Sequence, residues 1–209
     1  MDDFERAHQF KSDFFWTCFK ALDFNQITGD YVEFGCHGAR TFRLAYDQIV
    51  SRPKIKRHLW AFDSFKGLPQ ARDPRDHHPV WTPGKMRTSI DEFRDTLRDH
   101  GVGPDAYTTI EGYFRESLFK PDTTYPDDIA LAYIDCDLFS STCDALDFLS
   151  PRLKHGMILA FDDFFCWSSD QISGEKAAFE AFVSSQTRWR FERYRDYGWA
   201  GASYVVEAR

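Results

Sequence analysis

The chain has 209 residues and a formal charge of −7, with 43% hydrophobic and 17% aromatic residues. This length suits one α/β domain with a sizeable core, spanning residues 1–209, and excludes two ordinary domains. The composition excludes a disordered or fibrous chain. The negative charge disfavours nucleic acid as a partner, because binding phosphates would need a local basic patch. The densest basic run, within residues 52–58, is more typical of a solvated connection between elements.

The cysteines and the first residues bear on the compartment. The five cysteines are odd in number and contain no C-x-x-C pair, which disfavours a zinc site or a redox couple. The opening MDDFERAHQF lacks the basic and apolar regions of a signal peptide. No segment approaches the ~18 consecutive apolar residues of a membrane helix. We therefore expect a soluble, cytoplasmic protein with reduced thiols and no membrane partner.

The first 28 residues form a predicted helical segment. Apolar residues recur at spacings of three to five, which predicts an amphipathic helix over residues 4–24: Phe10, Phe14, Phe15, Phe19 and Leu22. Such a stripe usually packs on the core. A helical lid over a ligand is the alternative, because aromatic side chains also line apolar pockets.

Five β-rich segments then alternate with helical stretches. The strands are expected at 31–35, 58–65, 106–112, 129–137 and 157–164, and the helices at 39–51, 88–100, 141–154 and 173–185. Ser140, Ser141 and Thr142 offer an N-cap for the third of these helices. Apolar strands that alternate with helices are typical of a parallel sheet covered on both faces. The sequence thus predicts an α/β, Rossmann-like, doubly wound and mostly parallel sheet.

Two further segments refine this prediction. Residues 188–208 contain two strand-like runs around Asp196, Tyr197 and Gly198 with no helix between them, which predicts a terminal antiparallel hairpin. A parallel sheet that ends in such a hairpin is typical of class I methyltransferases. Residues 68–88 are irregular and proline-rich, and we expect them to form a mobile substrate loop near the ligand crevice. Adjacent His77 and His78 lack a spaced partner, so metal binding by them is disfavoured.

The ends of the first three strands could hold an adenosine cofactor. The turn Glu33-Phe34-Gly35-Cys36-His37-Gly38 has two glycines that let the backbone approach a ligand. It is not G-x-G-x-x-G, which disfavours a nicotinamide dinucleotide. Asp63 can accept both hydroxyls of a ribose, or it can cap its own turn. Gly112 and Tyr113 would lie beside an adenine ring.

Four carboxylates follow the fourth and fifth strands. Asp135 and Asp137 flank Cys136, and Asp162 and Asp163 end the next strand. Carboxylates this close raise one another's pKa unless a cation neutralises them, and oxygen ligands favour a hard metal such as Mg²⁺. Helix capping explains one or two of these acids but not four after buried apolar runs.

With these residues in view, the chain resembles the macrocin O-methyltransferase (TylF) family of metal-dependent sugar O-methyltransferases. The similarity is carried by GDYVEFGCHGARTF, AFDSFKGLP, IEGYFRESL and IALAYIDCDLFSSTCDALDFLSPRLKHGMILAFDDF. It implies that Glu33, Gly35 and Gly38 contact the methionine part of S-adenosylmethionine, that Asp63 holds the ribose, and that Gly112 and Tyr113 lie by the adenine. The expected cofactor site also includes Phe34, Cys36, Thr41, Ser64 and Asp135.

The resemblance further assigns Asp135, Asp162 and Asp163 to a divalent metal and makes Asp137 the general base. We therefore expect Mg²⁺-dependent methylation of a small-molecule hydroxyl, on a sugar moiety of a natural product or glycan. A catechol-like phenol is the alternative acceptor, and an NAD-dependent oxidoreductase or a non-catalytic binding module is the alternative class. Assembly into a homo-oligomer stays open.

Overall fold

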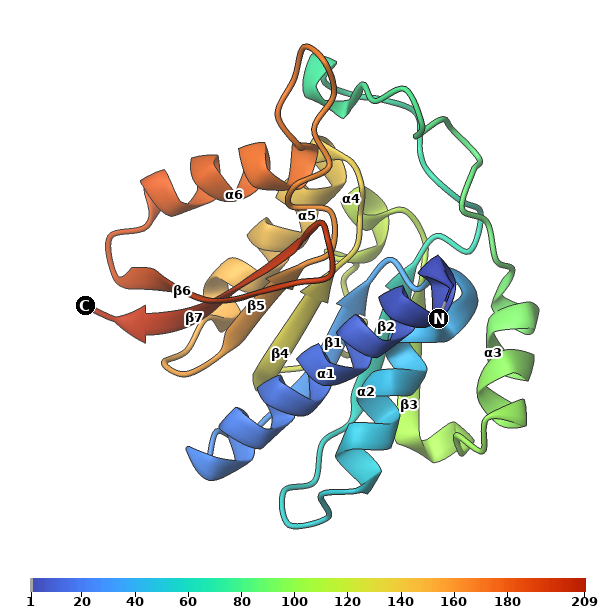
Figure 1. The fold of residues 1–209 in the computed structure, drawn as a ribbon, viewed down its shortest axis with the longest axis vertical. Coiled ribbons are helices and arrows are strands. Elements are labelled where there is room, and N and C mark those ends of the chain that lie inside the picture. Colours follow the sequence, from blue (N-terminus) through green and yellow to red (C-terminus); the bar gives the residue numbers. More distant parts are fainter. Residues whose placement is uncertain (1) are drawn as a thin grey trace.

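A seven-stranded sheet forms the centre of the computed structural model, which describes residues 2–209 (Figure 1). Its strand order is β3-β2-β1-β4-β5-β7-β6. The strands are β1 (Asp30–Phe34), β2 (Leu59–Asp63), β3 (Tyr107–Glu111), β4 (Ile129–Ile134), β5 (Ile158–Phe161), β6 (Trp189–Tyr197) and β7 (Gly201–Ala208). The first five are parallel, and β7 pairs antiparallel with both β5 and β6. The predicted sheet and its terminal hairpin are therefore confirmed.

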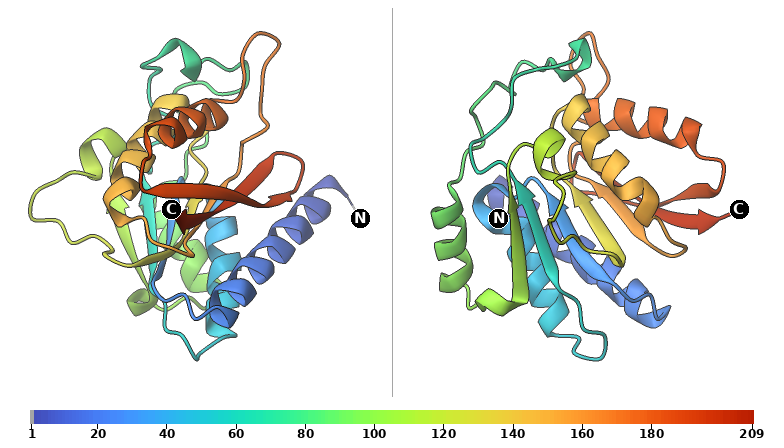
Figure 2. Two further views of the ribbon diagram at one scale, coloured as in Figure 1. Left: turned by 90° about the vertical axis from the view of Figure 1, so that its left-hand side faces the viewer. Right: turned by 180° about the vertical axis from the view of Figure 1, so that it is seen from behind.

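Helices cover both faces of this sheet, as the edge-on view in Figure 2 shows. The helices α1, α2 and α3 lie on one face, and α4, α5 and α6 lie on the other. Their bounds are α1 (Asp3–Phe24), α2 (Arg40–Val50), α3 (Ile90–Asp99), α4 (Phe114–Ser117), α5 (Phe139–Leu149) and α6 (Gly174–Ser185). Short 3-10 helices occur at His37–Ala39, Pro74–Asp76, Pro104–Ala106 and Ser150–Arg152. Among residues 2–209, no helix has the length and apolarity needed to cross a bilayer.

Most of the apolar stripe of α1 packs on the sheet, as the core interpretation predicted: Phe14, Phe15, Phe19 and Leu22 are buried, whereas Phe10 is 47% exposed. Asp2 begins the helix with a capping box to Glu5. Phe14 stacks on Tyr197 with 3.8 Å between ring centroids, and Phe15 lies 5.2 Å from the ring of Tyr133. Burial of each ring contributes about 1.5–3 kcal/mol, so this half of α1 is firmly held. The first turns of the helix extend beyond these rings.

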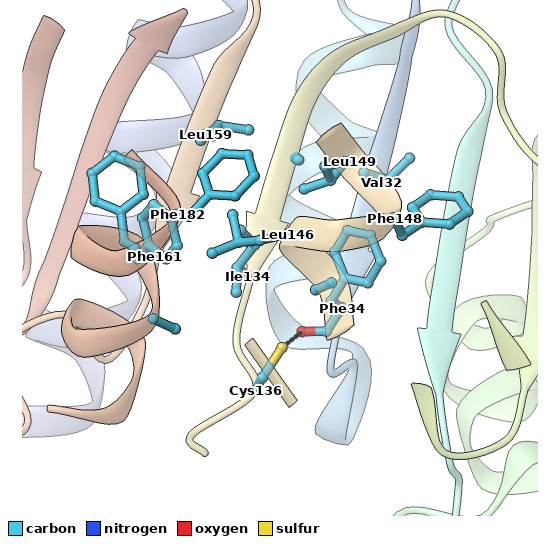
Figure 3. Packing of buried hydrophobic residues seen from close by; sticks show 14 of the residues in the cluster. Val32, Phe34, Ile134, Cys136, Leu146, Phe148, Leu149, Leu159, Phe161 and Phe182 are labelled. Carbon is cyan, nitrogen blue, oxygen red and sulfur yellow. Dashed lines mark hydrogen bonds between the residues drawn. The ribbon is translucent and has the colours of Figure 1, made fainter. Parts of the chain in front are cut away.

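The opposite face is packed mainly by α5 and α6 (Figure 3). Phe34 of β1 stacks on Phe62 of β2 at 4.9 Å and meets Phe148 of α5 edge-on at 5.9 Å. The thiol of Cys136 donates to the carbonyl oxygen of Phe34 at 3.5 Å, as Figure 3 shows. The loop that follows β4 is thus attached to the end of β1.

The register of the parallel strands brings their ends into one row. Phe34 pairs with both Phe62 and Ile134, and Ile134 pairs with Phe161. The next residue of each strand therefore lies at the same edge of the sheet: Gly35, Asp63, Asp135 and Asp162. Neighbouring strands lie only ~4.8 Å apart. At Gly35, φ is 87°, and a Cβ atom would come within 1.8 Å of the carbonyl oxygen of Asp135, so glycine is required there.

One predicted helix start is wrong. The helix α5 begins at Phe139 with Leu138 as its N-cap, so Ser140, Ser141 and Thr142 lie inside its first turn. The capping carboxylate comes from Asp76 in the 68–88 loop, which accepts hydrogen bonds from the backbone N–H of Ser140 at 2.7 Å and from its hydroxyl at 2.8 Å. A distant acid thus replaces a local hydroxyl as the cap.

The same contact attaches the 68–88 loop to the sheet's carboxyl edge. Asp76 is buried and also accepts from the backbone N–H of Arg72 at 2.6 Å. The side chain of Gln171 donates to the carbonyl of Pro74 at 3.2 Å, which joins this loop to the segment before α6. These two loops lie side by side in Figures 1 and 2. The mobility of the 68–88 loop stays a prediction.

Candidate active site

A cavity of about 1230 Å³ opens at the carboxyl edge of the sheet. The side chains and backbone that line it come mainly from the segments that follow β1 to β5, including the 68–88 loop, and also from α1 and the turn between β6 and β7. The predicted site residues that line it are Gly35, Gly38, Thr41, Asp63, Ser64, Tyr113, Asp135, Asp137, Asp162 and Asp163. Four other predicted residues, Glu33, Phe34, Cys36 and Gly112, are absent from its wall. The topology therefore gathers most of the predicted site around one space.

Asp63 joins the turns after β1 and β2. One carboxylate oxygen accepts from the backbone N–H of Cys36 at 2.7 Å, and the other accepts from the backbone N–H of Phe65 at 2.6 Å. Burial raises its pKa, and these hydrogen bonds oppose that rise. The turn-capping interpretation is thus observed. A ribose role for the same carboxylate stays a prediction.

Glu33 lies beneath the cavity and has no exposed surface. Its carboxyl accepts from the hydroxyl of Thr41 at 2.7 Å and from the hydroxyl of Tyr31. Burial raises the pKa of Glu33 to about 8, and the two hydroxyls act against this rise. Glu33 therefore supports Thr41, which lines the cavity, and direct contact with a donor stays a prediction.

The acids after β4 and β5 form one buried group. Asp137 and Asp163 both line the cavity, and Asp137 is only 9% exposed. Burial raises the pKa of Asp135, Asp137 and Asp163, and their mutual repulsion adds to the rise. These three carboxyls are therefore harder to ionise together than exposed acids are.

The backbone at Asp137 is strained. Its φ is 61°, a left-handed conformation that costs a non-glycine residue on the order of 1–3 kcal/mol. Residues in such conformations persist where the surroundings force them and cluster at functional sites. Asp137 lines the cavity together with Asp135 and Asp163.

Sequence reasoning missed Glu175, which connects the two acid-bearing loops. Glu175 lies in the first turn of α6 and has no exposed surface. One carboxyl oxygen accepts from the backbone N–H of Cys136 at 3.1 Å, and the other accepts from the backbone N–H of Asp163 at 2.9 Å. Acidic residues are common in the first turn of a helix, so the position of Glu175 in the sequence did not indicate this role.

Lys11 and Tyr133 were also missed. The ammonium of Lys11 lies 2.6 Å from one oxygen of Asp162, and the hydroxyl of Tyr133 donates to the other at 2.6 Å. Lys11 falls three and four residues before Phe14 and Phe15, on the face of α1 that packs on the sheet. A lone charge on a buried stripe was the signal that could have identified it, because lysine is rarely buried without a partner.

The carboxylates of the acid group suit a divalent ion chemically, but their side chains are not arranged around one position for it. Buried carboxylate oxygens are the ligands that Mg²⁺ prefers, and a cation would relieve the repulsion that raises their pKa values. Across residues 2–209, however, no three His, Cys, Asp or Glu side chains are gathered as ligands of one ion. Both oxygens of Asp162 are engaged by Lys11 and Tyr133. An ion bound by Asp162 would therefore lie close to the ammonium of Lys11.

Comparison with known families agrees with this geometry. Residues 9–183 match the family described as macrocin-O-methyltransferase (TylF), which is most of the chain. The chain belongs to the TylF family. Two curated relatives are the 8-demethyl-8-(2,3-dimethoxy-alpha-L-rhamnosyl)-tetracenomycin-C 4'-O-methyltransferase of Streptomyces olivaceus and the demethyldecarbamoylnovobiocin O-methyltransferase of Streptomyces niveus. The TylF chain is 27% identical to the first over 157 residues and 25% identical to the second over 152 residues. Each match covers 70% of this chain and 57% of the relative.

Solved structures show the same fold. The O-methyltransferase NovP superimposes with a TM-score of 0.76 at 19% identity, covering 96% of this chain and 80% of NovP. A calicheamicin methyltransferase superimposes with a TM-score of 0.69 at 24% identity, covering 93% of this chain and 77% of its own. These likenesses establish the class I methyltransferase fold, which the strand order 3-2-1-4-5-7-6 also has.

Proposed function

We propose that this TylF-family chain transfers a methyl group from S-adenosylmethionine to a hydroxyl on a sugar moiety of a natural product. The observation that carries the proposal is the row of Gly35, Asp63, Asp135 and Asp162 along one cavity, with Asp137 beside it. The family supports methyl transfer to oxygen, and both curated relatives are named as O-methyltransferases of natural products, one with a rhamnosyl group.

The donor half of the cavity lies over β1 and β2. Gly35 and Gly38 expose backbone there, Asp63 supplies a carboxylate near the ribose position, and Tyr113 supplies a ring for the adenine. Thr41 is fixed from below by Glu33. We assign these residues to S-adenosylmethionine, which when bound supplies a methyl group on a positively charged sulfur.

The acceptor half lies over β4 and β5 and has an aromatic rim. Trp81, Trp167 and Trp199 line the cavity, and Trp167 and Trp199 are 65% and 80% exposed. Large flat side chains of this kind can cover the apolar face of a sugar ring. They would also stack on a phenol, which is therefore the second candidate acceptor. A screen of sugars and catechols with labelled donor separates the two.

Asp137 takes the acceptor proton in our proposal. The O–H bond of the acceptor breaks, its proton moves to the Asp137 carboxylate, and the oxygen forms a bond to the methyl carbon while the carbon–sulfur bond breaks. Burial and the neighbouring acids raise the pKa of Asp137, which makes its carboxylate a stronger base than an exposed aspartate. Its strained backbone fixes the carboxylate at the cavity wall, so positioning supplies part of the rate.

The metal part of the proposal rests on Asp135, Asp162 and Asp163. These residues would hold a divalent ion, which when bound makes a nearby hydroxyl more acidic. If this part is correct, EDTA should stop methyl transfer and added Mg²⁺ should restore it. Full activity in the chelator, measured with labelled donor, would remove the metal and leave the rest of the proposal intact.

Asp137→Asn tests the general base. The variant should bind S-adenosylmethionine within about twofold of the wild type by calorimetry, while kcat falls by about 10²- to 10⁴-fold. Asp47→Asn, at a half-exposed position of α2 outside the cavity wall, is the matched control and should keep wild-type turnover. Unchanged methylation by Asp137→Asn would exclude the role. Tight NAD binding without any response to S-adenosylmethionine would overturn the proposed function itself.

A further inference from the structure

Lys11 is the cation that α1 brings to the acid group. Its ammonium lies 2.6 Å from Asp162, and the two side chains are only 22% and 13% exposed. Within residues 2–209, no second lysine or arginine forms an ion pair with Asp135, Asp137, Asp162 or Asp163. A single ammonium therefore offsets a group of buried acids.

The helix holds this ammonium in place. Lys11 lies one turn before Phe14 and Phe15, whose rings pack against Tyr133 at 6.4 and 5.2 Å between centroids. Tyr133 itself donates to the second oxygen of Asp162. The same packing thus positions both partners of Asp162, and neither belongs to a loop.

A divalent ion bound by Asp162 would lie close to the ammonium that Lys11 already places there. Two cations at such a short distance repel each other, so a charged Lys11 makes ion binding at Asp162 less favourable. The ammonium of Lys11 already offsets the negative charge of Asp162, which an ion would otherwise neutralise. The free energy gained by ion binding is therefore smaller while Lys11 stays in place.

We propose that Lys11 competes with a divalent metal for Asp162 and thereby weakens metal binding at the acid group. The inference rests on the proposed metal site and goes beyond it by naming the residue that sets its affinity. Lys11 also lines the cavity from α1, and so does Phe4 near the start of the same helix. Displacement of the Lys11 ammonium by an ion would therefore move a part of the cavity wall that belongs to α1.

The test is a calorimetric titration of the protein with Mn²⁺ in the presence of S-adenosylhomocysteine. Lys11→Met keeps the apolar stem of the side chain and removes its charge, and we expect it to bind Mn²⁺ at least about tenfold more tightly than the wild type. Lys11→Arg keeps the charge and should stay near the wild-type affinity. Lys154→Met is the matched control, because Lys154 pairs with Asp128, outside the cavity wall.

Equal or weaker Mn²⁺ binding by Lys11→Met would overturn the inference, and so would the absence of binding in every variant. Thermal unfolding without metal verifies that each variant is folded, and Lys11→Gln gives the same comparison if Lys11→Met unfolds. Binding is measured without turnover, which separates this inference from the proposed function. A gain in affinity together with EDTA-resistant wild-type activity would support Lys11 competition and contradict metal-dependent catalysis.

Discussion

Glu33 illustrates how one buried acid links stability to pH. Its carboxyl lies under the end of β1 with the hydroxyls of Tyr31 and Thr41 as partners. Burial raises its pKa from 4.5 to about 8. Between these two values the folded protein keeps a proton that the unfolded chain releases. Its contribution therefore makes the folded state less stable as the pH rises through this window.

Glu33→Gln should remove this dependence. The wild type should lose stability relative to the variant as the pH rises from 5 to 8, by up to about 1.4 kcal/mol per pH unit. Urea unfolding at pH 5, 6.5 and 8 measures the difference, and Glu180→Gln, on the exposed side of α6, is the control. A difference that is constant across this range would show that Glu33 does not keep its proton in the folded protein.

At the scale of elements, the site depends on contacts between the strand ends and the helices behind them. The acids after β4 and β5 are far apart in the sequence, and Glu175 of α6 accepts from the backbone of both segments. Gly174 packs against the start of α5, where a Cβ atom would lie 2.6 Å from the backbone nitrogen of Phe139. The first turn of α6 thus sets the spacing of the acid group.

Glu175→Ala should disturb this spacing. Two buried N–H groups would lose their acceptor, at a cost of about 1–3 kcal/mol each. Methyl transfer should fall with stability, because Cys136, next to Asp137, and Asp163 lose their common acceptor. Thermal unfolding and labelled-donor assays measure both effects. Glu180→Ala, on the same helix, should change stability by no more than about 0.5 kcal/mol. Wild-type behaviour of Glu175→Ala would mean that the two loops are held by other contacts.

For the whole molecule, parallel topology explains why residues from five sequence regions meet at one cavity. The carboxyl ends of β1 to β5 share one edge of the sheet, and the 68–88 loop is attached above it through Asp76. The chain spans 57% of the length of the curated relatives that it matches. The wall of this cavity nonetheless includes Trp167 and Trp199 from the acceptor side and Asp63 from the donor side.

The sequence by itself determined the order of elements, the parallel sheet with its terminal hairpin, and most of the residues at the strand ends. These features follow from the local hydrophobic periodicity, which can be read from the sequence, and from the rule that parallel strands end at a common edge. The acids Asp135 and Asp162 could therefore be placed together without coordinates.

Only the tertiary structure decided which groups these residues contact. The contacts join residues that are far apart in the sequence. Asp76 caps α5 across 64 positions, Glu175 reaches Cys136 across 39, and Lys11 reaches Asp162 across 151. The contacts of Glu33 with Tyr31 and Thr41 likewise became visible only in the structure. Such contacts depend on how helices pack across the sheet, and local patterns contain no record of that packing.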